Sequence, residues 1–214
     1  MSSSTSSVAE ILRAARLIPV LTIERLDRAV PLARALVAGG VRTLEITLRT
    51  PAGADAAAAI QAEVPDAIVG LGTVVARRDL ELAKRLKLPF AFSPGATPEL
   101  LDAAAELGVP FIPGIATASE LIAVMARGFT TVKLFPAEQA GGLGTLKALA
   151  GPFPSALFNP TGGVSQSNMR AYLALPNVVA VGGSWLAPAA DIEAGNWTAI
   201  TERAQQAMRE ALSS

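Results

Sequence analysis

The chain of 214 residues contains neither cysteine nor histidine. Without cysteine it can form no disulfide, no thiolate metal site and no cysteine nucleophile. Without histidine it lacks the catalytic triads and the zinc motifs that depend on an imidazole. We therefore expect no metal site, and any proton transfer must use carboxylates, lysines, hydroxyl groups or water.

An excess of charge is also absent, because 18 basic and 18 acidic residues give a formal net charge of zero. No basic block stands out, so we expect neither nucleic acid nor a membrane surface as a partner. No apolar run is long enough to span a bilayer, and no basic-then-apolar signal peptide is recognisable. These absences favour a cytoplasmic protein that acts on small molecules.

Hydrophobic residues make up 51% of the chain, and short apolar runs alternate with longer amphipathic, alanine-rich runs. We expect strands over residues 17–22, 43–48, 68–73, 90–93, 111–114, 130–135, 157–160 and 178–181. We expect helices over residues 8–16, 27–38, 52–64, 78–86, 98–107 and 168–175, over segments ending near 127 and 150, and over 198–212.

Repeated strand–helix alternation implies a parallel sheet. The strands are too apolar to be exposed on one face, which favours a closed (β/α)₈ TIM barrel over an open doubly wound sheet. The helix that precedes the first strand would be an extra N-terminal helix. We predict a flexible tail over residues 1–7 and a single barrel domain over residues 8–214.

Lys133 lies inside an apolar run, Thr130–Phe135, which Pro136 ends. An ammonium group is costly to bury, and burial favours the neutral amine. A neutral lysine amine can form a Schiff base with a ketone. The alternative is that Lys133 reaches solvent or pairs with a carboxylate at the end of the barrel.

Polar residues gather at the carboxyl ends of the expected strands, where such barrels build their active sites. Because strand side chains alternate, Glu45, Thr47 and Arg49 share one face. The remaining members of this group are Thr73, Ser93, Pro94, Lys133, Thr161, Gly162, Gly163, Gly182, Gly183 and Ser184.

The glycine pairs follow the last two expected strands, each beside a hydroxyl residue, Thr161 or Ser184. Loops at these places commonly bind phosphate through backbone N–H groups. Simpler interpretations remain open at this stage. Glu45 could pair with Arg49, Thr73 could be an ordinary strand residue, and the glycine pairs could be tight turns.

Together these residues suit a metal-free aldol reaction on a phosphorylated 2-keto acid. Lys133 would form an iminium that accepts electrons, and Glu45 would move protons. The guanidinium of Arg49 would bind the substrate carboxylate as a planar fork, and Thr73 would donate to the same group. The glycine loops would hold the phosphate at the other end of the substrate.

These motifs resemble those of the 2-keto-3-deoxy-6-phosphogluconate (KDPG) and 4-hydroxy-2-oxoglutarate (KHG) aldolase family. The matching segments follow the order of the family and cover nearly the whole chain after the tail. They are residues 19–20, 35–40, 44–50, 70–74, 93–95, 113–115, 133–138, 160–163 and 182–185.

The resemblance implies a class I aldolase, a carbon–carbon lyase of the Entner–Doudoroff pathway. Such an enzyme cleaves KDPG to pyruvate and D-glyceraldehyde 3-phosphate and often also cleaves KHG. The family forms homotrimers and needs no cofactor beyond the covalent lysine imine. It implies Lys133 as the Schiff-base residue and Glu45 as the proton-transfer residue. The substrate-binding residues that it implies are Arg49 and Thr73 at the pyruvate end, Pro94, Phe135 and Thr161 along the pocket, and Gly162, Gly163, Gly183 and Ser184 at the phosphate end.

One departure from the family pattern is Asn159, which stands where many members carry cysteine. Three alternatives are also open. The chain could be the aldolase for the galactonate epimer, or an isomerase or synthase on a phosphate-binding barrel without a Schiff base. The joint absence of cysteine and histidine is also compatible with an engineered trimeric scaffold.

Overall fold

The computed structural model describes residues 7–213, so residues 1–6 of the expected tail lie outside the described residues. Ser7, the last residue of the expected tail, is the N-cap of the first helix. The Glu10 N–H donates to the Ser7 hydroxyl at 3.3 Å, and the Ser7 N–H donates to the Glu10 carboxylate at 2.7 Å. This reciprocal capping box satisfies two N–H groups that the helix itself leaves free.

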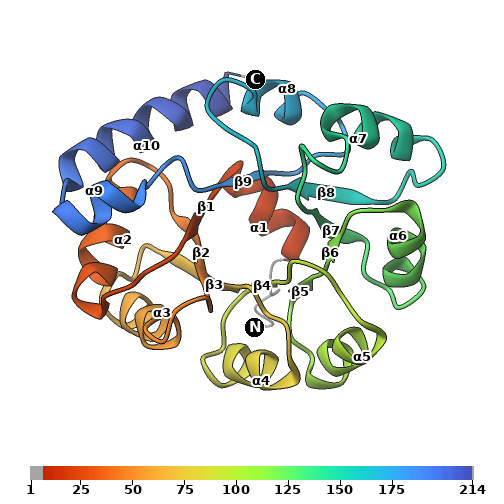
Figure 1. Ribbon diagram of the computed structural model, residues 1–214, viewed down its shortest axis with the longest axis horizontal. Helices are drawn as coiled ribbons and strands as arrows, with labels where there is room; N and C mark the ends of the chain where they lie inside the picture. Colours follow the sequence, from red (N-terminus) through yellow and green to blue (C-terminus); the bar gives the residue numbers. More distant parts are fainter. Residues whose placement is uncertain (1–6, 214) are drawn as a thin grey trace, which may run out of the picture.

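Strands and helices alternate along the described chain (Figure 1). The strands are β1 (Leu17–Leu21), β2 (Thr43–Thr47), β3 (Ile68–Gly72), β4 (Ala91–Phe92), β5 (Phe111–Ile112), β6 (Gly114–Ile115), β7 (Thr131–Leu134), β8 (Leu157–Pro160) and β9 (Val181–Gly183). The helices are α1 (Val8–Ala15), η1 (Leu26–Arg28), α2 (Ala29–Ala38), α3 (Gly53–Glu63), α4 (Arg77–Arg85), α5 (Pro98–Leu107), α6 (Ala118–Met125), α7 (Gly142–Ala150), α8 (Met169–Leu173), α9 (Ala189–Ala194) and α10 (Trp197–Leu212).

All strand pairs of the described residues are parallel, as expected. One sheet has the order β5-β4-β3-β2-β1-β9, and a second has the order β6-β7-β8. Single bridges join Phe158 to Val178 and Thr161 to Gly182, between the ends of the two sheets. The sheets curl, and helices α2 to α10 surround them as in a TIM-barrel-like α/β fold (Figure 1).

Two expected strands differ from the structure. The strand expected over residues 111–114 is divided into β5 and β6 at Pro113, which has no N–H to donate to a ladder. The strand expected over residues 178–181 begins only at Val181. Its pairing with β1 runs through Gly182 and Gly183, whereas Val178 makes one isolated bridge to β8.

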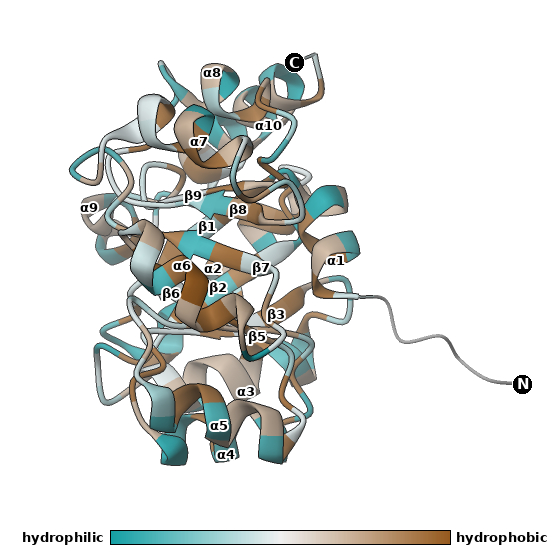
Figure 2. Ribbon diagram, turned by 90° about the vertical axis from the view of Figure 1, so that its right-hand side faces the viewer, coloured by the Kyte–Doolittle hydropathy of each residue, from teal (hydrophilic) through white to brown (hydrophobic). Residues whose placement is uncertain are grey.

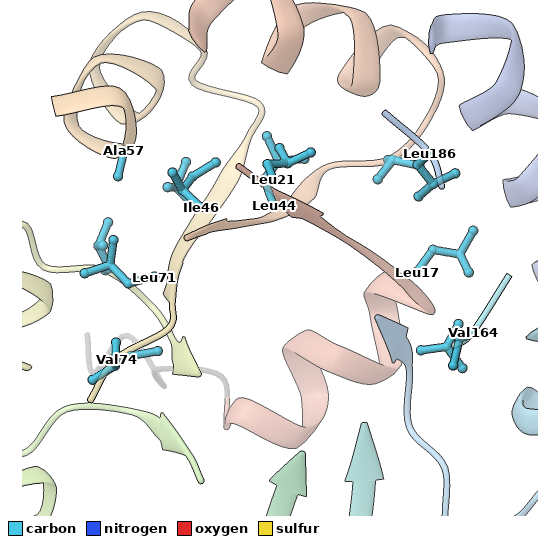
Figure 3. Close-up of a cluster of buried hydrophobic side chains, with 14 of the residues drawn as sticks. Leu17, Leu21, Leu44, Ile46, Ala57, Leu71, Val74, Val164 and Leu186 are labelled. Atoms are coloured by element: carbon cyan, nitrogen blue, oxygen red, sulfur yellow. The ribbon is translucent and has the colours of Figure 1, made fainter. Parts of the chain in front are cut away.

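The first helix α1 lies across one end of the ring of strands, as the two views of the fold agree (Figures 1 and 2). Leu12 of α1 is fully buried in a cluster with Ile18, Phe90, Phe92 and Ile112. A larger apolar cluster fills the space between the strands and the surrounding helices. Figure 3 shows part of it, with Ile46 of β2 facing Ala57 of α3.

The strands are largely hydrophobic, whereas the surrounding helices carry both hydrophobic and polar residues (Figure 2). Among the described residues, no helix combines the length and the apolar character that a membrane span requires.

Candidate active site

The centre of the site is a buried ion pair between Lys133 of β7 and Glu45 of β2. The Lys133 Nζ lies 2.8 Å from Oε1 and 3.0 Å from Oε2 of Glu45. Lys133 is 3% exposed and Glu45 is 0% exposed. The Nζ donates to both carboxylate oxygens, which offsets the cost of removing two charges from water. Lys133 therefore does not reach solvent, and it pairs with a carboxylate as the alternative interpretation allowed.

A glycine leaves space for the carboxylate of this pair, and two aromatic rings lie beside its amine. A Cβ atom on Gly72 of β3 would come within 2.2 Å of the Glu45 Oε1, so the carboxylate fits only beside a glycine. The Lys133 Nζ lies 4.9 Å from the ring centre of Phe92 and 5.6 Å from that of Phe135. Aromatic faces at these distances attract a cation. Phe135, predicted to line the pocket, thus lies beside the amine.

The expected alternative pair of Glu45 and Arg49 does not form. Arg49 lies past the end of β2, and its Nε donates to the Thr73 hydroxyl at 3.1 Å. Thr73 follows β3 and has a φ of +60°, which is rare for a β-branched residue. Thr73 is therefore no ordinary strand residue. The structure brings the two residues expected at the pyruvate end into direct contact.

The glycines after β8 adopt backbone conformations that other residues avoid. The φ angles of Gly162 and Gly163 are +98° and +80°. Together with Thr161, Gly183 and Ser184 they line a pocket of about 120 Å³. This pocket also contains Arg49 and thus includes expected residues of both ends of the substrate. A groove of about 820 Å³ on the surface contains none of the predicted site residues.

The remaining expected positions are connected to this site in different ways. The Thr47 hydroxyl donates to the Leu21 carbonyl at 3.1 Å, and the Ser93 hydroxyl accepts from the Gly114 N–H at 3.0 Å. A Cβ atom on Gly114 would lie 2.3 Å from the carbonyl carbon of Pro94. These contacts join the ends of different strands and place Pro94 against the backbone of Gly114.

Some residues of the site were not among the predicted ones. Val20, Thr22 and Val164 also line the pocket of about 120 Å³. Thr22 directly follows β1, so the rule that pointed to the other strand ends also applies to it. Asn159 of β8 is opposite Lys133 in the strand pairing, and it is fully buried. Its Oδ1 accepts from the Thr161 hydroxyl at 3.2 Å, whereas its Nδ2 has no partner among the described residues.

Comparisons with known proteins identify the family of the chain. The family model described as KDPG and KHG aldolase matches residues 8–203. A 2-dehydro-3-deoxy-phosphogluconate aldolase of Pseudoalteromonas atlantica is 52% identical, and the match covers 89% of each chain. The KHG/KDPG aldolase of Escherichia coli K12 is 49% identical over 97% of this chain and 98% of the relative.

A solved structure of a KDPG aldolase has the same fold. The KDPG aldolase of Legionella pneumophila, which holds pyruvate as a covalent carbinolamine intermediate, superimposes with a TM-score of 0.91 at 42% identity. The match covers 94% of this chain and 98% of that chain.

The alternatives have weaker support. A structure described as native KDPGal is 28% identical, with a TM-score of 0.79, over 92% of this chain and 96% of that chain. A designed cube-shaped protein cage is 25% identical, with a TM-score of 0.74, over 91% of this chain and 73% of that chain. Neither the epimer-specific aldolase nor an engineered scaffold is therefore favoured. With a matching family model over most of its length and relatives near 50% identity, the chain belongs to the KDPG and KHG aldolase family.

Proposed function

We propose that this protein is a class I aldolase that cleaves KDPG to pyruvate and D-glyceraldehyde 3-phosphate, and that it also acts on KHG. The observation that carries this proposal is the buried contact of 2.8 Å between the Lys133 Nζ and the Glu45 carboxylate. A lysine held beside a carboxylate can pass on its proton and become a nucleophile. The dual name of the Escherichia coli relative supports the second substrate.

The reaction would begin when the Lys133 amine attacks the C2 carbonyl carbon of the substrate. A C–N bond forms, the carbonyl π electrons move to oxygen, and a proton passes from nitrogen to that oxygen to give a carbinolamine. Protonation of the hydroxyl group and loss of water then give the iminium. Glu45 is within hydrogen-bond distance of the nitrogen, so it is placed to accept and return these protons.

Cleavage would follow from the electron demand of the iminium. A base removes the proton of the C4 hydroxyl, the C3–C4 bond breaks, and its electron pair moves toward the iminium nitrogen. The products are the aldehyde and an enamine, which is then protonated at C3. Water finally releases pyruvate and restores the Lys133 amine. We assign the base to Glu45, acting directly or through a water molecule.

The other residues would orient the substrate. Arg49, already held by Thr73 at 3.1 Å, is placed to bind the carboxylate. Gly162, Gly163, Gly183 and Ser184 lie together in one pocket, where their N–H groups and the Ser184 hydroxyl suit a phosphate. We assign Phe135, Pro94 and Thr161 to the walls between these two ends.

Four broader features belong to the same proposal. The bridges from Phe158 to Val178 and from Thr161 to Gly182 support a closed eight-stranded barrel, with α1 as an extra N-terminal helix across one end. Residues 8–214 would form one domain, preceded by a tail. By resemblance to the family the enzyme would be a homotrimer. Because its phosphorylated substrate does not cross membranes unaided, we place it in the cytoplasm.

The decisive test traps the imine. The protein is incubated with pyruvate and sodium borohydride, and its intact mass is measured. We expect one reduced pyruvate adduct on the parent chain, none on Lys133→Ala, and one on Lys147→Ala, in which an exposed lysine is removed. An adduct that persists in Lys133→Ala, or a parent chain without an adduct, would contradict the mechanism.

A further inference from the structure

The loop after β8, residues 161–165, lines the proposed phosphate pocket. Residues outside the pocket donate hydrogen bonds to the carbonyl groups of this loop. The carbonyl of Thr161 accepts from the Ala137 N–H at 2.8 Å, and that of Gly162 accepts from the Glu138 N–H at 3.0 Å. The carbonyl of Gly163 accepts from the Asn168 Nδ2 at 3.1 Å. Three successive carbonyl groups of the loop thus accept hydrogen bonds from two segments, the one after β7 and the one before α8.

The N–H groups of the same loop are used differently. In the part of the chain that the structure describes, the N–H group of Gly163 donates to no other residue, whereas Gly162 lies next to the bridge between Thr161 and Gly182. Both glycines line the pocket of about 120 Å³. Since an N–H group without a protein partner is a donor available to a bound anion, the orientation of this loop decides how well it binds phosphate.

The side chains of Glu138, Asn168 and Tyr172 are joined to one another by hydrogen bonds next to the loop. The Glu138 Oε1 accepts from the Tyr172 hydroxyl, and it accepts from the Asn168 Nδ2 at 3.4 Å. The Asn168 Oδ1 also accepts from the Ser165 N–H at 2.8 Å. Asn168 therefore binds the loop on both sides of Val164, and Glu138 connects Asn168 to Tyr172 of α8.

The packing behind the loop is close. A Cβ atom on Gly163 would lie 2.3 Å from the Glu138 Cγ, and one on Gly142, at the start of α7, would lie 2.9 Å from the Tyr172 hydroxyl oxygen. Tyr172 is 0% exposed. Burial, and then the hydrogen bond to Glu138, raise the pKa of the Tyr172 hydroxyl, so this group remains a donor throughout the neutral range.

We infer that Glu138, Asn168 and Tyr172 form a positioning cluster that holds the phosphate-binding loop in its productive shape and so sets the preference for phosphorylated substrates. This inference rests on the proposed function. The three side chains act through the loop, because their hydrogen bonds are with the loop and with one another. Substrates that lack a phosphate should therefore be insensitive to them.

The main test uses Tyr172→Phe, which removes one hydroxyl and keeps the ring. We expect the KM for KDPG to rise on the order of 10-fold with kcat nearly unchanged, because a hydrogen bond to a charged group is lost. The rate of imine formation with pyruvate, which has no phosphate, should stay within about twofold of the parent rate. Glu138→Ala should match this effect, and Glu138→Gln, whose amide oxygen can still accept from Tyr172, should restore most of the affinity.

A second measurement keeps the inference separate from the proposed activity. Binding of inorganic phosphate to the parent chain and to the variants is followed by ³¹P NMR, which requires no turnover. A 10-fold weaker affinity in Tyr172→Phe supports the inference. Equal phosphate affinity in all variants, or an equal loss toward KDPG and pyruvate, would overturn it. A parent chain that binds phosphate but cleaves no KDPG would contradict the proposed function alone.

Discussion

The inner sides of the strands differ sharply from one end to the other. Next to α1 they carry Ile18, Phe90 and Ile112, all 0% exposed and in one apolar cluster with Leu12. Toward the carboxyl ends they carry Glu45, Lys133, Asn159 and Thr161, all 4% exposed or less. Both regions are buried, but one is apolar and the other consists of charged and polar groups.

This difference separates stability from chemistry. Burial of an apolar side chain contributes roughly 1.5–3 kcal/mol. A buried ion pair, in contrast, contributes little relative to apolar residues of similar size. The polar region also contains a buried amide nitrogen of Asn159 that has no partner among residues 7–213, and Thr73 with a φ of +60°. The apolar region thus stabilises a fold in which the other end is arranged for reaction.

The largest expected change in stability comes from breaking the ion pair between Lys133 and Glu45. Lys133→Met leaves the Glu45 carboxylate buried without its partner, and we expect the free energy of unfolding to fall by about 3–5 kcal/mol. The double variant Lys133→Met with Glu45→Leu should recover most of this loss. Urea denaturation of the parent, both single variants and the double variant measures the difference. If Lys133→Met changed stability by less than about 1 kcal/mol, the pair would not be desolvated in solution.

A substitution at the apolar end should lower stability without changing catalysis. Leu12→Ala removes a fully buried side chain, and we expect a loss of about 3 kcal/mol in the free energy of unfolding. Because Leu12 neither contacts the Lys133 amine nor lines the pocket of about 120 Å³, kcat for KDPG should remain within about twofold at temperatures where the protein is folded. Leu212→Ala, at a position 69% exposed, is the matched control. A large fall in kcat for Leu12→Ala would show that the two ends are coupled.

The sequence predicts much of this arrangement because local signals agree with the fold. Thr117 precedes a helix and accepts from the Glu120 N–H, and Gly108 ends another with a φ of +65°. Lys133 was recognisable because a charge in an apolar strand demands a partner. Helix α9 was missed, although Pro188 precedes it and Gly195, with a φ of +71°, ends it.

The partners of the site residues were harder to predict, since they depend on contacts between distant parts of the chain. The sequence allowed Glu45 to pair with Arg49 four positions on, whereas its partner is Lys133, 88 positions away. Strand alternation places Glu45 and Arg49 on one face but does not show that β2 ends at Thr47. Tyr172 in the same way reads as an apolar residue of a short helix, and only the fold brings its hydroxyl to Glu138.

The smallest expected effect concerns the strained backbone at Thr73. A left-handed conformation costs a β-branched residue roughly 1–2 kcal/mol, and glycine avoids this cost but loses more entropy on folding. We therefore expect Thr73→Gly to raise the free energy of unfolding by up to about 1 kcal/mol. Lys87→Gly, at an exposed position with a φ of +54°, should give a similar gain.

The two glycine variants should differ in activity. Thr73→Gly removes the hydroxyl that accepts from the Arg49 Nε, so the guanidinium loses the contact that orients it. The KM for pyruvate in the imine-trapping reaction should rise several-fold, whereas Lys87→Gly should leave it unchanged. Equal KM values in both variants would show that Arg49 is oriented by other contacts. If Thr73→Gly gains stability and binds pyruvate more weakly, whereas Lys87→Gly only gains stability, then the backbone strain at Thr73 is linked to binding. Such strain would lie at the carboxyl ends of the strands and not at the apolar end.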